Sequence, residues 1–256
     1  MKLKKLNFIE ILIWLSIIGV LGMIFQANLC HYSYCLDADI ASEGVLARLI
    51  WESGEWIPST WYVAMETRIV DVANLAALVY GFVKNMSLAM GIACSIMSVA
   101  ILASAYFFLC SLKVNSVQKG IFLLLCLILP NNFMTINLLY LYASYYAPHM
   151  IVLFITMGFY VRFMDKRVSL SGVILTLFLH FALGMQGVRE ILMVAGPIFA
   201  VEIIRVLYLW YRKELYDVND KKIFAWSLAL IIIGFLGGLT PYSVEQSFSR
   251  NIRKAP

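Results

Sequence analysis

The feature that most constrains this chain is a series of long apolar runs, each close to the length that crosses a lipid bilayer. A transmembrane helix needs about 20 mostly apolar residues. The chain is 62% hydrophobic and only 14% charged, whereas soluble domains are usually roughly a quarter charged. It is therefore predicted to be an all-α, multi-pass membrane protein with about seven transmembrane helices. The runs lie at residues 7–26, 88–110, 120–138, 149–164, 170–186, 191–209 and 223–240.

The first run is expected to stay in the protein as a transmembrane helix. Its apolar stretch is longer than the roughly 7–15 residues of a signal-peptide core, and no small-x-small cleavage site follows it. The chain ends at "SFSRNIRKAP", shortly after the last run, which leaves open whether it is a truncated N-terminal module of a longer protein. We expect residues 1–256 to form a single transmembrane module.

Basic residues predict the orientation of the helices in the cell membrane. If residues 69–83 lie along the membrane surface, most of the Lys and Arg residues fall on the side of the N-terminus. The positive-inside rule assigns that side to the cytoplasm. The first loop, residues 27–87, is then extracytoplasmic and rich in acids: Asp37, Asp39, Glu43, Glu52, Glu55, Glu66 and Asp71.

The acidic first loop is predicted to contain two helices on the membrane surface. Residues 39–53 have helical character, and Gly54 is a natural C-terminal stop. Residues 69–83 form an apolar run that is too short and too polar to cross easily. One face of the first helix contains two acids and two apolar side chains: Asp39, Glu43, Leu46 and Ile50. Aromatic residues that suit the headgroup region follow it: Trp56, Trp61 and Tyr62.

Asp39 is the candidate general base of this loop. It lies one helical turn from Glu43 at the head of an apolar stripe, so we expect it to face the membrane or protein, a setting that suits proton transfer. A plainer interpretation is that Asp37 or Asp39 caps the helix. Glu52 and Glu55 are expected on a solvated face.

The same loop resembles the first outer loop of the GT-C superfamily of membrane glycosyltransferases. The likeness is to the branch that contains protein O-mannosyltransferases and the lipid A aminoarabinose transferase. Those enzymes carry an acid just after the first helix, then a run of the form Ala-Arg-x-x-x-Glu-Ser-Gly-Asp-Trp and a proline. Glu66 falls where that branch has a glutamate before a proline pair. The resemblance covers residues 37–68 in motif and 8–165 in layout. The other matching residues are Asp39, Ala47, Arg48, Glu52, Ser53, Gly54, Glu55, Trp56 and Pro58.

Three features of the sequence depart from the pattern of the superfamily. Ile40 replaces the second acid of the usual pair, unless Asp37 serves in its place. Thr67 and Arg68 stand where the proline pair is expected. His149 follows the turn of the second outer loop, where the family usually has an aspartate, and a histidine cannot reproduce that carboxylate.

The resemblance implies transfer of a sugar from a polyprenyl-phosphate donor to an envelope glycan, lipid or protein acceptor at the extracytoplasmic face. Asp39 is then the base, and Arg189 suits the leaving phosphate because arginine binds phosphate through two parallel hydrogen bonds. No metal or other cofactor is implied. The alternative is a non-catalytic protein that binds or translocates lipid-linked sugars. Substrate-binding residues would be Asp37, Glu43, Glu66, Arg68, His149 and Arg189.

Plainer interpretations accompany several of these residues. Arg189 could pair with Glu190 at the membrane interface, and His180 is expected to be a packing residue inside its helix. Glu202 and Arg205 are three residues apart and are expected to form a structural ion pair. Cys30 and Cys35 share the first loop and leave a disulfide open. A basic stripe with interleaved aromatics is missing from the sequence, so nucleic acid is not expected as a partner.

Overall fold

Helices account for all regular structure in the described part of the chain, which confirms the predicted all-α class. The computed structural model describes residues 8–58, 60–61, 68–130, 132–165, 169–213 and 217–252, with side chains described as far as residue 240. The chain divides into two compact units. The first contains Met1–Pro58 and Asp71–Phe154, and the second contains Ser59–Val70 and Ile155–Pro256. The single module over residues 1–256 stays a prediction.

Five of the predicted runs form helices that are long and apolar enough to cross a membrane. The last of them is the first part of a longer helix, α10 (Val218–Ile252), and another consists of the π-helix η2 (Ile191–Ala195) and α9 (Gly196–Arg212). These lengths agree with a multi-pass membrane protein, while the side on which each loop lies stays a prediction. The remaining three are α1 (Phe8–Cys30), α4 (Met86–Ser111) and α7 (Ala147–Met164).

The other two runs do not form long straight helices. The run at 120–138 gives α5 (Ser116–Ile128) and α6 (Phe133–Leu139), which are bent by 115° and count as a sixth candidate only if they form one broken span. Pro130 lies at the break, and the side chain of Asn132 caps the new helix by accepting from the N–H of Thr135. The run at 170–186 gives α8 (Leu170–Gly184), which has only 15 residues. Seven transmembrane helices are therefore not confirmed.

The first loop folds into the two helices that the sequence predicts. A short 3-10 helix, η1 (Tyr32–Cys35), leads to α2 (Ala38–Ser53), which ends at Gly54 in the left-handed conformation with φ 70°. The second helix, α3 (Val72–Val83), begins at Asp71, whose buried carboxylate accepts from the N–H of Val72 at 2.7 Å. Capping accounts for this acid in an apolar run. The position of both helices on the membrane surface stays a prediction.

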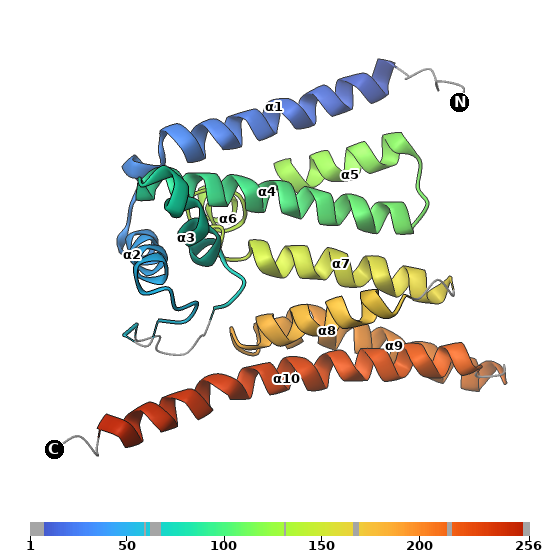
Figure 1. The fold of residues 1–256 in the computed structure, drawn as a ribbon. Coiled ribbons are helices and arrows are strands. Elements are labelled where there is room, and N and C mark those ends of the chain that lie inside the picture. The colour runs from blue at the N-terminus through green and yellow to red at the C-terminus, as the bar shows by residue number, and fades with distance from the viewer. Residues whose placement is uncertain are drawn as a thin grey trace. The chain divides into compact units, whose positions relative to one another are not determined.

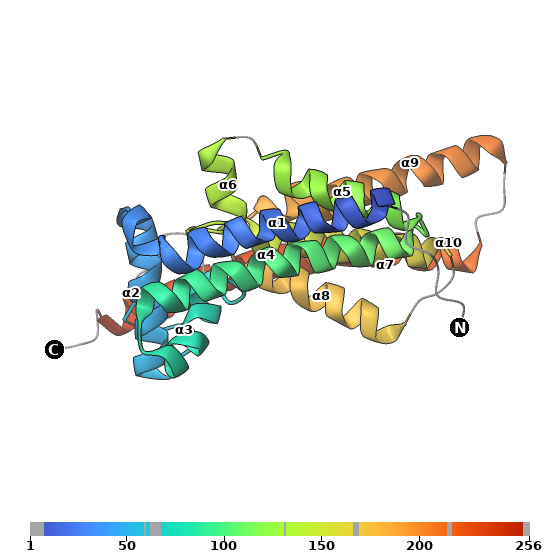
Figure 2. The ribbon, with the colours of Figure 1, turned by 90° about the horizontal axis from the view of Figure 1, so that it is seen from above.

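In the first unit, α1 and α4 run side by side (Figures 1 and 2). They approach closely at Gly91 of α4, because a Cβ atom there would collide with the backbone carbonyl oxygen of Asn28. The buried Asn28 amide donates to the carbonyl oxygen of Tyr140 at 3.0 Å. A glycine contact and a buried amide thus fix the end of α1 from which the first loop leaves.

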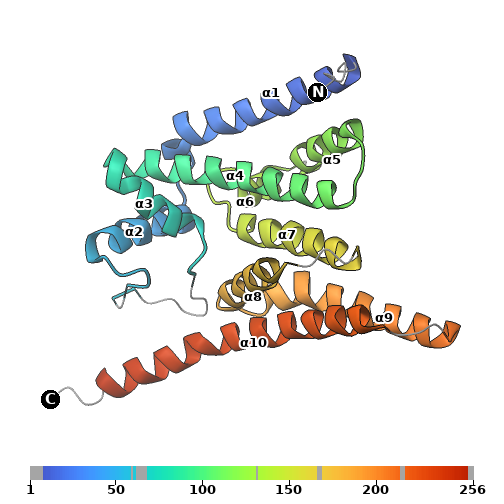
Figure 3. The same cartoon turned by 45° about the vertical axis from the view of Figure 1, so that its right-hand side comes forward.

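In the second unit, α8 and α10 pack through small residues (Figure 3). A Cβ atom on Gly184 would collide with the carbonyl oxygen of Gly234, and one on Gly237 would collide with that of Phe181. Glycine at these positions lets two helix backbones touch, which is a common way to pack helices in membranes.

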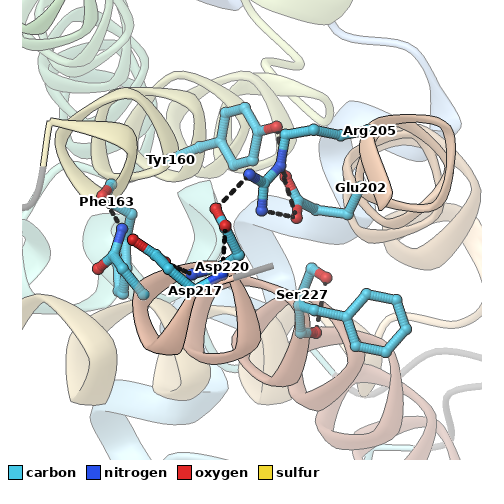
Figure 4. Close-up of polar contacts among 9 residues, drawn as sticks. Tyr160, Phe163, Glu202, Arg205, Asp217, Asp220 and Ser227 are labelled. Carbon is cyan, nitrogen blue, oxygen red and sulfur yellow. Dashed lines mark hydrogen bonds and ion pairs between the residues drawn. The ribbon is translucent and has the colours of Figure 1, made fainter. Parts of the chain in front are cut away.

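Figure 4 shows the polar network that joins α7, α9 and α10 in the second unit. The Arg205 guanidinium contacts the carboxylate of Glu202 at 2.9 Å and that of Asp220 at 2.6 Å. The Tyr160 hydroxyl donates to Glu202 at 2.6 Å. Glu202 is fully buried, so its charge needs these partners. The predicted structural pairing of Glu202 with Arg205 is confirmed.

Candidate functional site

The head of α2 carries the candidate base. Asp37 is the N-cap, and its carboxylate accepts from the N–H of Ile40 at 2.8 Å, which confirms the capping alternative for this residue. Asp39 lies in the first turn and its side chain is exposed. The buried positions of α2 are Ile40, Gly44, Leu46, Ala47 and Ile50, so the protein covers the two apolar residues of the predicted stripe but leaves Asp39 exposed. Of the two expected surroundings of Asp39, the protein does not provide cover, and contact with the membrane stays a prediction.

Several motif residues of α2 have identifiable structural roles. Arg48 donates to Glu52 at 2.6 Å on the exposed face, and this hydrogen bond raises the pKa of the Arg48 guanidinium. Glu52 is exposed, in agreement with its expected position on a face of α2 that the protein does not cover. Ala47 is fully buried, and the carbonyl oxygen of Trp56 accepts from the side chain of Asn74 at 3.3 Å. These contacts set the start, the buried face and the exit of α2.

A buried tyrosine cluster lies beside the first loop, and sequence analysis did not find it. Tyr32 of η1 packs edge-on against Tyr142 with ring centroids 5.8 Å apart, and both rings are buried. Burial raises the pKa of Tyr32 above its ordinary range, and the nearby groups of Cys94, Tyr145, Glu43 and Asp37 add to the effect. The structure therefore brings two predicted site residues, Asp37 and Glu43, close to Tyr32.

Tyr142, the second tyrosine of this pair, forms a hydrogen bond with the thiol of Cys35 in η1. Burial raises the pKa of Tyr142 to about 12, and its hydrogen bond with Cys35 acts in the same direction. The density of tyrosines in "HYSYC" and "YLYASYY" is the only sequence signal that could have pointed to this cluster. The five cysteines are free thiols, so the disulfide between Cys30 and Cys35 is absent from this structure.

His149 lies near the start of α7 and is buried, with only 3% of its surface exposed. Its ring contacts that of Tyr146, with centroids 6.0 Å apart. A ligand at the surface cannot reach this buried ring. A role of His149 in substrate binding would therefore require the residues that cover the ring to move. Glu66 lies outside the described residues.

The two predicted basic residues, Arg68 and Arg189, both belong to the second unit. Arg189 is exposed and Arg68 is half-buried. Glu190, the next residue, is by contrast fully buried and forms an ion pair with His180. His180 is buried as expected, but its partner lies ten positions away on another element, which sequence periodicity could not indicate.

Among the described residues, no group of three or more His, Cys, Asp or Glu side chains is close enough to bind a metal ion. A groove of about 480 Å³ lies in the first unit between Phe25 and Leu29 of α1 and residues 92–100 of α4. Its lining is almost wholly apolar and does not include the acids of α2.

Comparisons of the chain with protein-family models, curated proteins and solved structures find no match.

Proposed function

We propose that the chain is a glycosyltransferase module of the GT-C type, which transfers a sugar from a polyprenyl phosphate to an envelope glycan, lipid or protein acceptor at the extracytoplasmic face. The observation that carries the proposal is α2. The motif residues from Asp39 to Ser53 lie in one helix that follows α1 and the short helix η1, with Asp37 as its N-cap and Gly54 as its C-cap.

Asp39 is the proposed general base. Its exposed carboxylate can be reached by an acceptor hydroxyl without any rearrangement of α2. In the reaction, the hydroxyl oxygen forms a bond to the anomeric carbon while its proton passes to the Asp39 carboxylate. The bond from that carbon to the phosphate oxygen breaks, and the polyprenyl phosphate leaves with the electron pair. A positioned base contributes about 10²–10⁴-fold to such a step.

Arg189 and Arg68 of the second unit are the proposed phosphate-binding residues. Charge builds on the leaving phosphate in the transition state, and a fixed guanidinium stabilises it more than water does. Arg189 is exposed, which suits a ligand that arrives from outside the unit. Its role can be tested separately from that of Asp39, because the two residues belong to different units.

Because its carboxylate accepts from the backbone N–H of Ile40, Asp37 is assigned in this proposal to capping and not to substrate binding, and the test of the base compares Asp39→Asn with Asp37→Asn. Both carboxylates are exposed and lie two residues apart, and asparagine caps a helix about as well as aspartate, so the second variant keeps α2 intact. We expect Asp39→Asn to lower the rate of sugar transfer by at least about 10²-fold and Asp37→Asn to leave it within a few-fold of wild type. Equal rates in both variants and wild type would remove Asp39 from the mechanism.

A second candidate function is non-catalytic binding or translocation of lipid-linked sugars. Burial of His149 favours it, because the second outer loop then offers neither a carboxylate nor an accessible imidazole. This function predicts that the purified wild-type chain binds a polyprenyl-phosphate sugar and returns it unchanged. Release of free polyprenyl phosphate in the presence of acceptor would exclude it.

A further inference from the structure

The turn between α8 and η2 is held from inside by one buried carboxylate. Glu190 Oε1 contacts Nδ1 of His180 on α8, and Nε2 of the same ring is 2.9 Å from the hydroxyl oxygen of Thr156 on α7. All three side chains are fully buried. If the Thr156 hydroxyl donates to Nε2, the imidazole keeps its proton on Nδ1 and directs it to the carboxylate. Three elements of the second unit therefore meet at Glu190.

A glycine of α10 makes the space for this carboxylate. A Cβ atom on Gly234 would collide with Oε2 of Glu190, whereas one on Gly238, a turn further along the same helix, would make only an ordinary contact of 3.4 Å. The position of Glu190 thus depends on the partner that holds it and on the absence of a side chain at residue 234.

Both proposed phosphate-binding arginines are connected to the same turn. Arg189 directly precedes Glu190 in helical backbone, and successive residues of a helix point roughly 100° apart, so a buried Glu190 turns Arg189 outward. Gln186, in the same turn, donates from Nε2 to the carbonyl oxygen of Val70 at 3.2 Å. Val70 lies two residues after Arg68. The turn therefore fixes the backbone beside each arginine.

We infer that the buried His180–Glu190 pair is a positioning device that holds Arg189 and Arg68 for the phosphate of a lipid-linked ligand. This inference rests on the proposed function. Neither member of the pair touches the ligand, and both act through the turn 184–190. A charged carboxylate is costly to bury alone, so the buried Glu190 needs His180 as its partner.

The test measures binding of decaprenyl phosphate to the full chain in detergent micelles. We expect Arg189→Ala to weaken binding roughly tenfold or more, the loss of one charge-assisted hydrogen bond. Gly234→Ala should weaken it to a similar extent, while the matched Gly238→Ala should bind as wild type does. The double variant with Gly234→Ala and Arg189→Ala should lose less binding than the two single losses combined, because displaced Glu190 acts partly through Arg189 and partly through Arg68. An additive loss is the result of a general structural defect and would overturn the inference.

Conservative replacement of Glu190 gives a second arm that does not depend on the glycine variants. Glu190→Gln keeps the shape and a hydrogen bond to His180, so it should bind within a few-fold of wild type, whereas Glu190→Ala should bind as weakly as Arg189→Ala. Wild-type binding by Gly234→Ala, with weak binding by Arg189→Ala, overturns the positioning role and leaves the proposed function intact. Wild-type binding by Arg189→Ala overturns the phosphate role itself, and with it this inference.

Discussion

The carboxylate of Asp37 accepts a hydrogen bond from the backbone N–H of Ile40 at 2.8 Å, and this contact sets where α2 begins. It assigns the two acids of the first turn to different tasks. Asp37 is occupied by the backbone as a cap, while Asp39, two residues later, presents an exposed side chain. The proposal therefore assigns the chemistry to Asp39 alone.

Replacing the cap should destabilise α2. We expect Asp37→Ala to lower the free energy of unfolding by about 0.5–2 kcal/mol and to speed hydrogen exchange in the first turn of the helix, because an N–H group loses its acceptor. Asp39→Ala, an exposed neighbour, should stay within about 0.5 kcal/mol of wild type. Equal exchange rates in the first turn of the two variants would show that Asp37 is not the effective cap.

A methyl group at Gly91 should separate α1 from α4. The added Cβ meets the backbone carbonyl oxygen of Asn28, which cannot rotate away, so Gly91→Ala should cost about 1–3 kcal/mol in stability. Gly22→Ala on α1, where no heavy atom lies within 4 Å of the added Cβ, should be neutral or stabilise the helix by up to about 1 kcal/mol. Unfolding in a denaturing-detergent titration measures both. A neutral Gly91→Ala would contradict the close approach.

Alkaline pH should destabilise the tyrosine cluster of the first unit. Burial raises the pKa of Tyr32 in the folded state, so its contribution to stability is fully present below the unfolded pKa of about 10. As the pH rises through the folded pKa, that contribution is lost, because the unfolded chain releases its proton more readily than the folded one. Tyr32→Phe should therefore reduce the loss of melting temperature between pH 9 and 11, with Tyr34→Phe, an exposed neighbour, as control.

The same substitution should cost little at neutral pH. The Tyr32 hydroxyl is buried and has no hydrogen-bond partner among the described residues, so removing it leaves no group unsatisfied. Tyr32→Phe is expected to be neutral or stabilising at pH 7. A clear loss of stability at pH 7, or an alkaline sensitivity equal to that of wild type, would contradict the buried, unpaired hydroxyl.

Removing Arg205 should strongly destabilise the second unit. Its loss leaves the fully buried Glu202 carboxylate without its countercharge, which typically costs about 3–5 kcal/mol. Arg212→Ala removes an exposed guanidinium that contacts the hydroxyl and the ring of Tyr208, and should change stability by no more than about 0.5 kcal/mol. Thermal unfolding of the purified variants compares the two. Similar melting temperatures would show that Glu202 is neutralised in another way.

The sequence was sufficient for features that depend on local signals. The helix over 39–53, its stop at Gly54 and five long apolar helices all follow from periodicity, a glycine and run length. The length of the apolar run at 120–138 predicted one continuous helix, whereas Pro130 and the Asn132 cap divide it into α5 and α6. Run length was also misleading at 170–186, because α8 ends after 15 residues.

The candidate site was predicted less completely, for a physical reason. Tyr32 and Tyr142, or His180 and Glu190, meet only after helices pack, and neither pair has the spacing of neighbours on one helix. The exposure of Asp39 likewise depends on which face of α2 packs against α3. Ile40, the next residue, is buried, so a rotation of the helix by one residue would exchange the exposed and buried positions. Tertiary packing decides these features. Periodicity in a single sequence predicts which residues share a helix face, but not which face packs against which neighbouring helix.

The most direct measurement of the central claim follows both products when the full chain, in membrane vesicles, is given a polyprenyl-phosphate sugar and an acceptor extract. The account predicts that one polyprenyl phosphate is released for each sugar joined to acceptor, and that both products stop together in Asp39→Asn while Asp37→Asn continues. Binding of the donor by the wild-type chain, with the sugar still attached to its lipid and no transfer to any acceptor, would contradict it.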